Sequence, residues 1–230
     1  MTADAAIAAR LDRVRDRIVS AGGDVAGITV VAVTKGFGAQ QVAAAIEVGL
    51  RDVGENYAQE LRGKVSTFKV STLDAATDAA VRWHFIGRLQ TNKVRSIAAD
   101  VALWQTVDRP ELAAEIAKRA HHAEVLIQVN TSGEAQKGGC APDQAADLVA
   151  RCRDLGLVVR GLMCVGPEGP PDESRAAFHS LASLADGLGL RERSMGMTDD
   201  LEVAVREGST MVRVGTALFG SRPASEGAHR

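Results

Sequence analysis

Short apolar runs alternate with amphipathic stretches along most of the chain. Residues 7–18 carry apolar side chains at helical spacing and stop before Gly22, which predicts an N-terminal helix. Residues 28–33 are apolar and mostly β-branched, which is typical of a strand buried on both faces of a parallel sheet. The same pattern predicts eight strands, at residues 28–33, 52–54, 83–87, 103–107, 124–130, within 157–165, 193–195 and 211–214.

Helical periodicity follows most of these strands. It predicts helices around residues 42–46, 58–65 and 92–98, from Pro110, from Asp143, over 178–188 and over 198–207. Residues 66–81 have the composition of a looser connection, and residues 223–230 that of a polar tail. Eight strand–helix units without a distinct linker predict one α/β domain over residues 1–230: a single (β/α)8 TIM-like barrel with an extra N-terminal helix and a core over about residues 24–222. An open doubly wound sheet is the alternative, because periodicity cannot show whether the sheet closes.

The composition is ordinary for a globular protein, with 46% hydrophobic and 24% charged residues. A net charge of −2 gives no reason to expect nucleic acid or an anionic membrane as a partner. Cys140, Cys152 and Cys164 form no C-x-x-C pair, so we expect reduced thiols and neither a disulfide nor a metal site. The sequence has no run of about 18 apolar residues and no leader-like N-terminal segment, so we expect a cytoplasmic protein.

Lys35 carries the sharpest chemical signal, because it ends an apolar strand directly before Gly36. Ligands of parallel barrels and sheets bind at the carboxyl ends of the strands. An amine held there is desolvated, which lowers its pKa and leaves a neutral nucleophile for an aldehyde. The alternative is a lysine that reaches from the barrel rim into solvent.

The last two predicted strand ends indicate a phosphate site. Ser194 and Gly196 stand before a predicted helix for which Thr198 is a plausible N-cap. Arg213, Gly215 and Thr216 follow the eighth strand. Barrels often bind phosphate with the loops after strands seven and eight, where glycine lets the backbone approach an anion. Ordinary turn and capping chemistry is the alternative for each loop.

Asn56, His84 and Met163 fall at further strand ends, so we expect them to line the same mouth. His84 could equally be a hydrogen-bonded interior residue, and Met163 could fill the barrel. Six separated motifs stand in order along the chain: Ala32-Val33-Thr34-Lys35; Asp52-Val53-Gly54-Glu55-Asn56-Tyr57; Trp83-His84-Phe85-Ile86-Gly87 with Leu89-Gln90-Thr91-Asn92-Lys93; Arg160-Gly161-Leu162-Met163; Ser194-Met195-Gly196-Met197; and residues 208–220.

Together these motifs resemble the YggS/PROSC group, the pyridoxal 5′-phosphate (PLP) homeostasis proteins, over about residues 28–222. The resemblance implies a fold-type III PLP barrel related to the alanine racemase N-terminal domain, without the second β domain of the racemases. It implies that Lys35 holds PLP as a Schiff base, that Ser194 with Gly215 and Thr216 holds the phosphate, and that Arg213 faces the pyridine nitrogen. It assigns no catalytic residue.

The resemblance favours a non-catalytic PLP-binding protein that stores, delivers or buffers PLP. As partners we expect PLP and apo PLP-dependent enzymes, and we expect the protein to be a monomer. A PLP-dependent racemase or decarboxylase of the same fold is the runner-up. The third candidate is a barrel isomerase that binds a sugar phosphate and no PLP.

Overall fold

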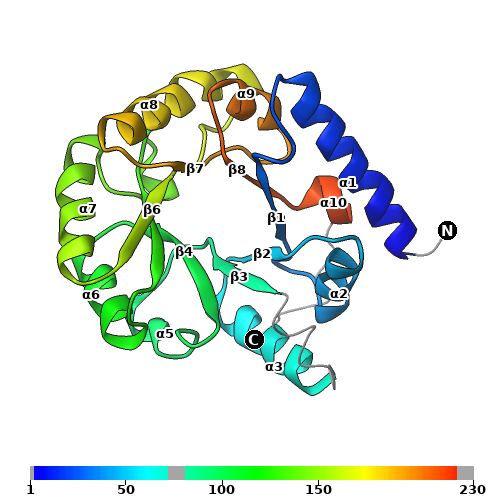
Figure 1. The fold of residues 1–230 in the computed structure, drawn as a ribbon, viewed down its shortest axis with the longest axis horizontal. Coiled ribbons are helices and arrows are strands. Elements are labelled where there is room, and N and C mark those ends of the chain that lie inside the picture. The colour runs from blue at the N-terminus through cyan, green and yellow to red at the C-terminus, as the bar shows by residue number, and fades with distance from the viewer. Residues whose placement is uncertain (1–2, 72–80, 222–230) are drawn as a thin grey trace.

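The computed structural model describes residues 3–71 and 81–221. Its eight strands are all parallel, each pairs with the next in chain order, and the last pairs with the first, so the sheet closes into a barrel (Figure 1). This confirms the predicted barrel against the open-sheet alternative. The strands are β1 (Thr29–Val33), β2 (Asp52–Glu55), β3 (Arg82–Phe85), β4 (Val101–Val107), β5 (Glu124–Gln128), β6 (Val158–Met163), β7 (Glu192–Ser194) and β8 (Met211–Val214).

Helices surround the barrel, as Figure 1 shows. The α-helices are α1 (Ala3–Ser20), α2 (Ala39–Glu47), α3 (Ala58–Ser71), α5 (Thr91–Val94), α6 (Pro110–Arg119), α7 (Ala145–Asp154), α8 (Ser174–Gly187), α9 (Leu201–Arg206) and α10 (Thr216–Phe219). Three short 3₁₀ turns add η1 (Ala135–Lys137), η2 (Pro142–Gln144) and η3 (Pro171–Glu173). The predicted N-terminal helix is α1, which contacts α2, α9 and α10 through an apolar face that includes Leu11, Val14 and Ile18.

The apolar residues of each strand pack in two directions. Outward-facing side chains and the helices form the main core, in which Phe85, Trp104 and Phe178 are fully buried. A smaller cluster, to which β1, β4, β5, β6 and β8 each contribute one residue, contains Val31, Leu103, Leu126, Met163 and Met211. Burial on both faces explains why the strands read as unbroken apolar runs.

Three segments differ from the sequence-based expectation. The helix predicted over 92–98 ends after one α-turn, because residues 96–100 continue with backbone bonds to the third residue back. The helix predicted over 198–207 begins only at Leu201, since Asp200 accepts the Met197 backbone N–H and holds residues 197–200 as a loop. Helix α3 runs on to Ser71, where a looser connection was expected. The rest of that connection, 72–80, and the tail 222–230 lie outside the described residues.

The three cysteines are free and buried. Burial raises the pKa of the Cys140 and Cys164 thiols to about 11 and that of Cys152 to about 12, so the thiols stay protonated at neutral pH. Within residues 3–71 and 81–221, no helix combines the length and the apolar character needed to cross a membrane.

Candidate functional site

A cavity of about 540 Å³, here called the inner cavity, opens at the carboxyl ends of the strands. Six of the eight predicted site residues line it: Lys35, Asn56, Met163, Arg213, Gly215 and Thr216. The other lining residues are Val33, Phe37, Ile86, Gly87, Arg88, Gln128, Gln136, Lys137, Val165, Glu168, Met197, Thr198, Asp199 and Gly220. The cavity therefore joins an amine, a guanidinium, hydroxyls and apolar side chains from strand ends far apart in the sequence.

Helix α3 holds the backbone on both sides of Lys35. Lys64 donates from Nζ to the Thr34 carbonyl at 2.6 Å, and the Gly36 N–H donates to Glu60 Oε2 at 2.8 Å. Gly36 has a φ of +75°, a left-handed conformation that favours glycine, so the chain can turn directly after the lysine. These contacts position Lys35 at the rim of β1, where its side chain enters the inner cavity.

A buried ion pair supports this arrangement. The Lys64 ammonium contacts the Glu55 carboxylate at the end of β2, and the Thr34 hydroxyl donates to the same Glu55 oxygen. Glu55 is fully buried and Lys64 is nearly so. Burial raises the pKa of Glu55, against the opposing influence of its contacts with Lys64 and Thr34. The pair ties β1, β2 and α3 together next to Lys35.

Arg213 lines the inner cavity although its side chain is almost fully buried. Nη2 donates to the Cys164 carbonyl at 2.8 Å, and Nη1 donates to Ser194 Oγ at 2.7 Å. Burial lowers the pKa of Arg213, yet a guanidinium remains charged at any physiological pH. A fixed positive charge therefore faces the cavity in one orientation.

Ser194 and His84 do not line the inner cavity, contrary to expectation. Both are fully buried inside the barrel, where Gln105 of β4 takes their hydrogen bonds. Ser194 Oγ donates to Gln105 Oε1 at 2.6 Å, and Gln105 Nε2 lies 2.8 Å from His84 Nδ1. His84 Nε2 in turn lies 3.0 Å from Asp52 Oδ1. This series of hydrogen-bond contacts runs from Asp52 to Arg213 and holds the guanidinium in place. Ser194 and His84 therefore affect the cavity indirectly, through the position of Arg213.

Two further residues were missed by sequence reasoning. Gln105 and its neighbour Thr106 are buried polar residues in the otherwise apolar strand β4, and that irregularity was a usable signal. Thr198 was expected to cap a helix but lines the inner cavity instead, and its Oγ1 accepts the Ala217 N–H at 3.4 Å. This contact joins the loop after β7 to helix α10, which directly follows the loop after β8.

Gly215 lies where those two loops meet β1. A Cβ on Gly215 would lie 3.3 Å from the Val33 carbonyl oxygen, so glycine allows the turn to pack closely against the end of β1. Thr198, Gly215 and Thr216 together border one side of the cavity. Hydroxyls and backbone at these two loops are the groups with which barrels hold phosphate. Asn56 adds a polar atom, since its Oδ1 is buried and has no hydrogen-bond partner among the described residues.

Comparison with known proteins gives three consistent matches. Residues 4–223 match the family model described as the alanine racemase N-terminal domain. The Pseudomonas aeruginosa protein named pyridoxal phosphate homeostasis protein is 42% identical over 221 residues, covering 91% of both chains. The Escherichia coli K12 protein of the same name is 37% identical and covers 96% of this chain and 98% of its own.

Solved structures agree with these matches. PipY of Synechococcus elongatus PCC7942, solved without PLP, superposes with a TM-score of 0.80 at 30% identity, covering 93% of this chain and 100% of PipY. The PipY structure with PLP bound gives a TM-score of 0.79 at 29% identity. An alanine racemase of Clostridium difficile 630 shares the barrel with a TM-score of 0.68 at 11% identity, with 58% of that enzyme covered. The chain belongs to the family of pyridoxal phosphate homeostasis proteins, which share the alanine racemase N-terminal domain.

Proposed function

We propose that this protein binds PLP in the inner cavity, with Lys35 as the attachment residue, and acts in PLP homeostasis without catalysing a reaction. The observation that carries the proposal is the convergence of Lys35, buried Arg213 and the Thr198–Gly215–Thr216 border on one cavity. The names of the relatives and the PLP-bound structure of PipY support it.

The residues present fit PLP group by group. Lys35 would hold the aldehyde of PLP as a Schiff base, with loss of water. Arg213 would lie toward the pyridine nitrogen, while Thr198, Gly215 and Thr216 would hold the phosphate. Asn56 Oδ1 would accept a hydrogen bond from the ligand and so gain the partner that it lacks among the described residues. Ser194 and His84 act behind Arg213, and Met163 supplies apolar surface.

The phosphate border is tested by comparing PLP with pyridoxal, which lacks the phosphate. Thr216→Val and Thr198→Val should each weaken PLP binding by about 1.5–3 kcal/mol, the range for one hydrogen bond to a charged group, and leave pyridoxal binding unchanged. Ser194→Ala should instead weaken both aldehydes alike, because it acts through Arg213. Fluorescence titration of each variant measures both constants. Equal affinity of the native protein for PLP and pyridoxal would show that Thr198, Gly215 and Thr216 do not bind the phosphate.

Purified protein should show no appreciable amino-acid racemization. Racemization needs a base within hydrogen-bond reach on each face of the substrate, and Lys35 serves only one. The sequence has one tyrosine, Tyr57, whose side chain is 61% exposed and does not line the inner cavity. The charged Arg213 also disfavours protonation of the pyridine nitrogen, which weakens the ring as an electron sink and limits decarboxylation equally.

Chiral analysis after incubation of PLP-loaded protein with L-alanine and other L-amino acids measures this activity. Turnover above roughly 1 per second, the low end for ordinary enzymes, that disappears in Lys35→Ala would establish the racemase alternative. Slow exchange of the α-proton without inversion is compatible with the proposal, since one lysine on one face suffices for it.

We further propose a domain organisation, a location, an oligomeric state and partners for the protein. Residues 1–230 act as one PLP-binding domain, the protein is a cytoplasmic monomer, and apo PLP-dependent enzymes receive the cofactor from it. The homeostasis name of the relatives supports the delivery role. The small net charge, −2, supports small-molecule and protein partners over nucleic acid.

A further inference from the structure

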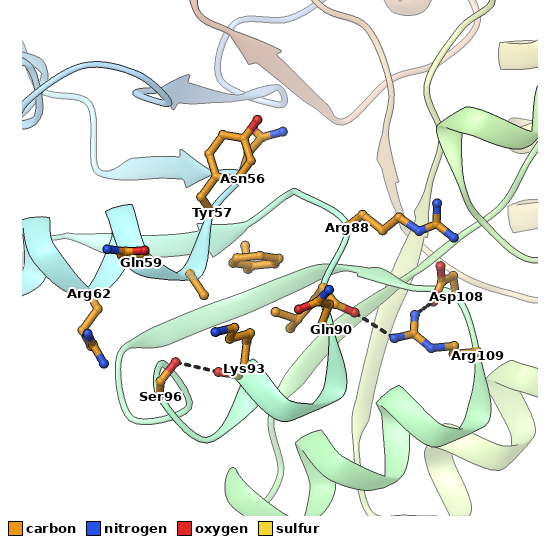
Figure 2. A pocket seen from close by; sticks show the side chains of 13 residues that line it. Asn56, Tyr57, Gln59, Arg62, Arg88, Gln90, Lys93, Ser96, Asp108 and Arg109 are labelled. Atoms are coloured by element: carbon orange, nitrogen blue, oxygen red, sulfur yellow. Dashed lines mark hydrogen bonds and ion pairs between the residues drawn. The ribbon is translucent and has the colours of Figure 1, made fainter. Parts of the chain in front are cut away.

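A second pocket lies beside the inner cavity, and its volume is larger, about 900 Å³. It is here called the outer pocket. It lies between the carboxyl ends of β2, β3 and β4 on one side and helices α3 and α5 on the other (Figure 2). A volume of this size is at the upper end of those of small-molecule sites.

The outer pocket is strongly cationic. Its lining includes four basic side chains and one acidic side chain, Asp108. Asp108 is neutralised by Arg109, whose Nη1 lies 2.5 Å from the carboxylate and whose Nη2 donates to the Leu89 carbonyl. The other three cations, Arg62, Arg88 and Lys93, have no ion pair or side-chain hydrogen bond to any residue in 3–71 or 81–221. Within the described part of the chain, three positive charges of the pocket therefore have no counter-charge in contact.

These cations come from separate segments. Arg62 belongs to α3, Arg88 follows β3, and Lys93 belongs to α5, and Figure 2 shows their side chains spread around the pocket. Each side chain is exposed, and single exposed cations are ordinary. Three cations around one pocket are different, because each adds to the positive potential that an anion meets there.

Apolar surface and a shared wall complete the pocket. Phe85 and Leu89 form a buried apolar floor in its lining, and Tyr57 is 61% exposed at its side, so the Tyr57 ring offers a surface against which a flat ring can pack. Asn56 and Arg88 line both the outer pocket and the inner cavity. A ligand in the outer pocket is thus next to the cavity that contains Lys35.

We propose that the outer pocket binds a phosphate monoester with a planar ring, a phosphorylated vitamin B6 form, without covalent attachment. This inference rests on the proposed function and deepens it, because it gives incoming or departing PLP a place beside Lys35. Guanidinium and ammonium groups are the usual partners of phosphate, and the exposed Tyr57 side chain receives the ring.

The test uses protein in which PLP already occupies the inner cavity covalently. PLP-loaded protein is reduced with borohydride, and its mass reports the occupancy of Lys35. It is then titrated calorimetrically with pyridoxine 5′-phosphate, which has an alcohol in place of the aldehyde and cannot attach to lysine. Inorganic phosphate and pyridoxine serve as separate arms that distinguish recognition of phosphate from recognition of the ring.

We expect one further equivalent of pyridoxine 5′-phosphate, weaker binding of inorganic phosphate, and none of pyridoxine. Arg62→Gln and Lys93→Gln should each weaken this binding by at least about fivefold, the loss of one charge-assisted contact, and added salt should weaken it too. Arg95→Gln is the matched control, since Arg95 is equally exposed next to α5 but outside the pocket, and should stay within about twofold.

Absence of a further equivalent in the reduced protein would overturn the inference, as would equal weakening by Arg95→Gln. Inorganic phosphate binding as tightly as pyridoxine 5′-phosphate would also overturn it, because the ring would then contribute nothing. Failure of the reduction to add mass to Lys35 would instead count against the proposed function, so the two failures are distinguishable.

Discussion

Lys35→Ala should abolish covalent attachment of PLP to this protein. Lys35 lines the inner cavity directly after the end of β1, the strand that pairs with β8. Without its amine no Schiff base can form, so the absorbance band beyond the aromatic region and the mass added by borohydride should both vanish. Weak binding should persist through Arg213, Thr198 and Thr216, because those contacts do not depend on the lysine.

Two other lysines test the specificity of this effect. Lys118→Ala is the matched control, since Lys118 is exposed on α6 far from the cavity lining, and the variant should take up label normally. Lys137 lines the inner cavity but is held by Glu134, 2.7 Å away, and by the Gly166 carbonyl. Full labelling of Lys35→Ala, through Lys137 or any other lysine, would contradict the assignment.

Lys64→Met should destabilise the fold by about 3–5 kcal/mol, the usual cost of removing one partner of a buried ion pair. Methionine fills similar space but leaves the fully buried Glu55 carboxylate without its cation. The loss should also loosen the backbone next to Lys35, because Lys64 donates to the Thr34 carbonyl. Chemical denaturation monitored by circular dichroism measures the free energy of unfolding.

The loss of folding stability caused by Lys64→Met should become larger as the pH rises. Burial already raises the pKa of Glu55 above its ordinary value, and removal of Lys64 raises it further. A carboxyl whose pKa is higher folded than unfolded loses stability as pH rises from the unfolded value, about 4.3, through the folded one. The variant should therefore be closer to the native protein at pH 5 than at pH 8.

Glu55→Gln combined with Lys64→Met should recover part of the loss, because the pair would then leave no buried charge. Lys118→Met, on the exposed face of α6, should change the stability by less than about 0.5 kcal/mol. A Lys64→Met protein as stable as the native one at pH 8 would show that Glu55 is neutral or solvated in the native state.

The barrel could be predicted from the sequence because each strand is buried on both faces, and that burial leaves unbroken apolar runs such as residues 29–33 and 211–214. Strand ends then located Lys35, Arg213 and Gly215, since side chains that follow parallel strands converge at one mouth. The location of these residues at the mouth of the barrel is predictable because it follows from their place at the carboxyl end of a strand.

The depth of a side chain inside the barrel was not predictable. Ser194 ends β7 and His84 lies within β3, yet both side chains lie inside the barrel, where they contact Gln105. The register and stagger of the strands decide which layer of the barrel a side chain occupies. Thr198 reached the cavity only because Asp200 delays the start of α9. The contact of Lys64 with Glu55 joins a helix to a strand, and sequence spacing carries no signal for such a pair.

We infer that PLP is held covalently on Lys35. Borohydride reduction of PLP-loaded native protein, followed by protease digestion and peptide mass mapping, tests it most directly. We predict one phosphopyridoxyl group per chain, on the peptide that contains Lys35. The same mass on a peptide containing Lys64, Lys93 or Lys137, with Lys35 unmodified, would contradict the account.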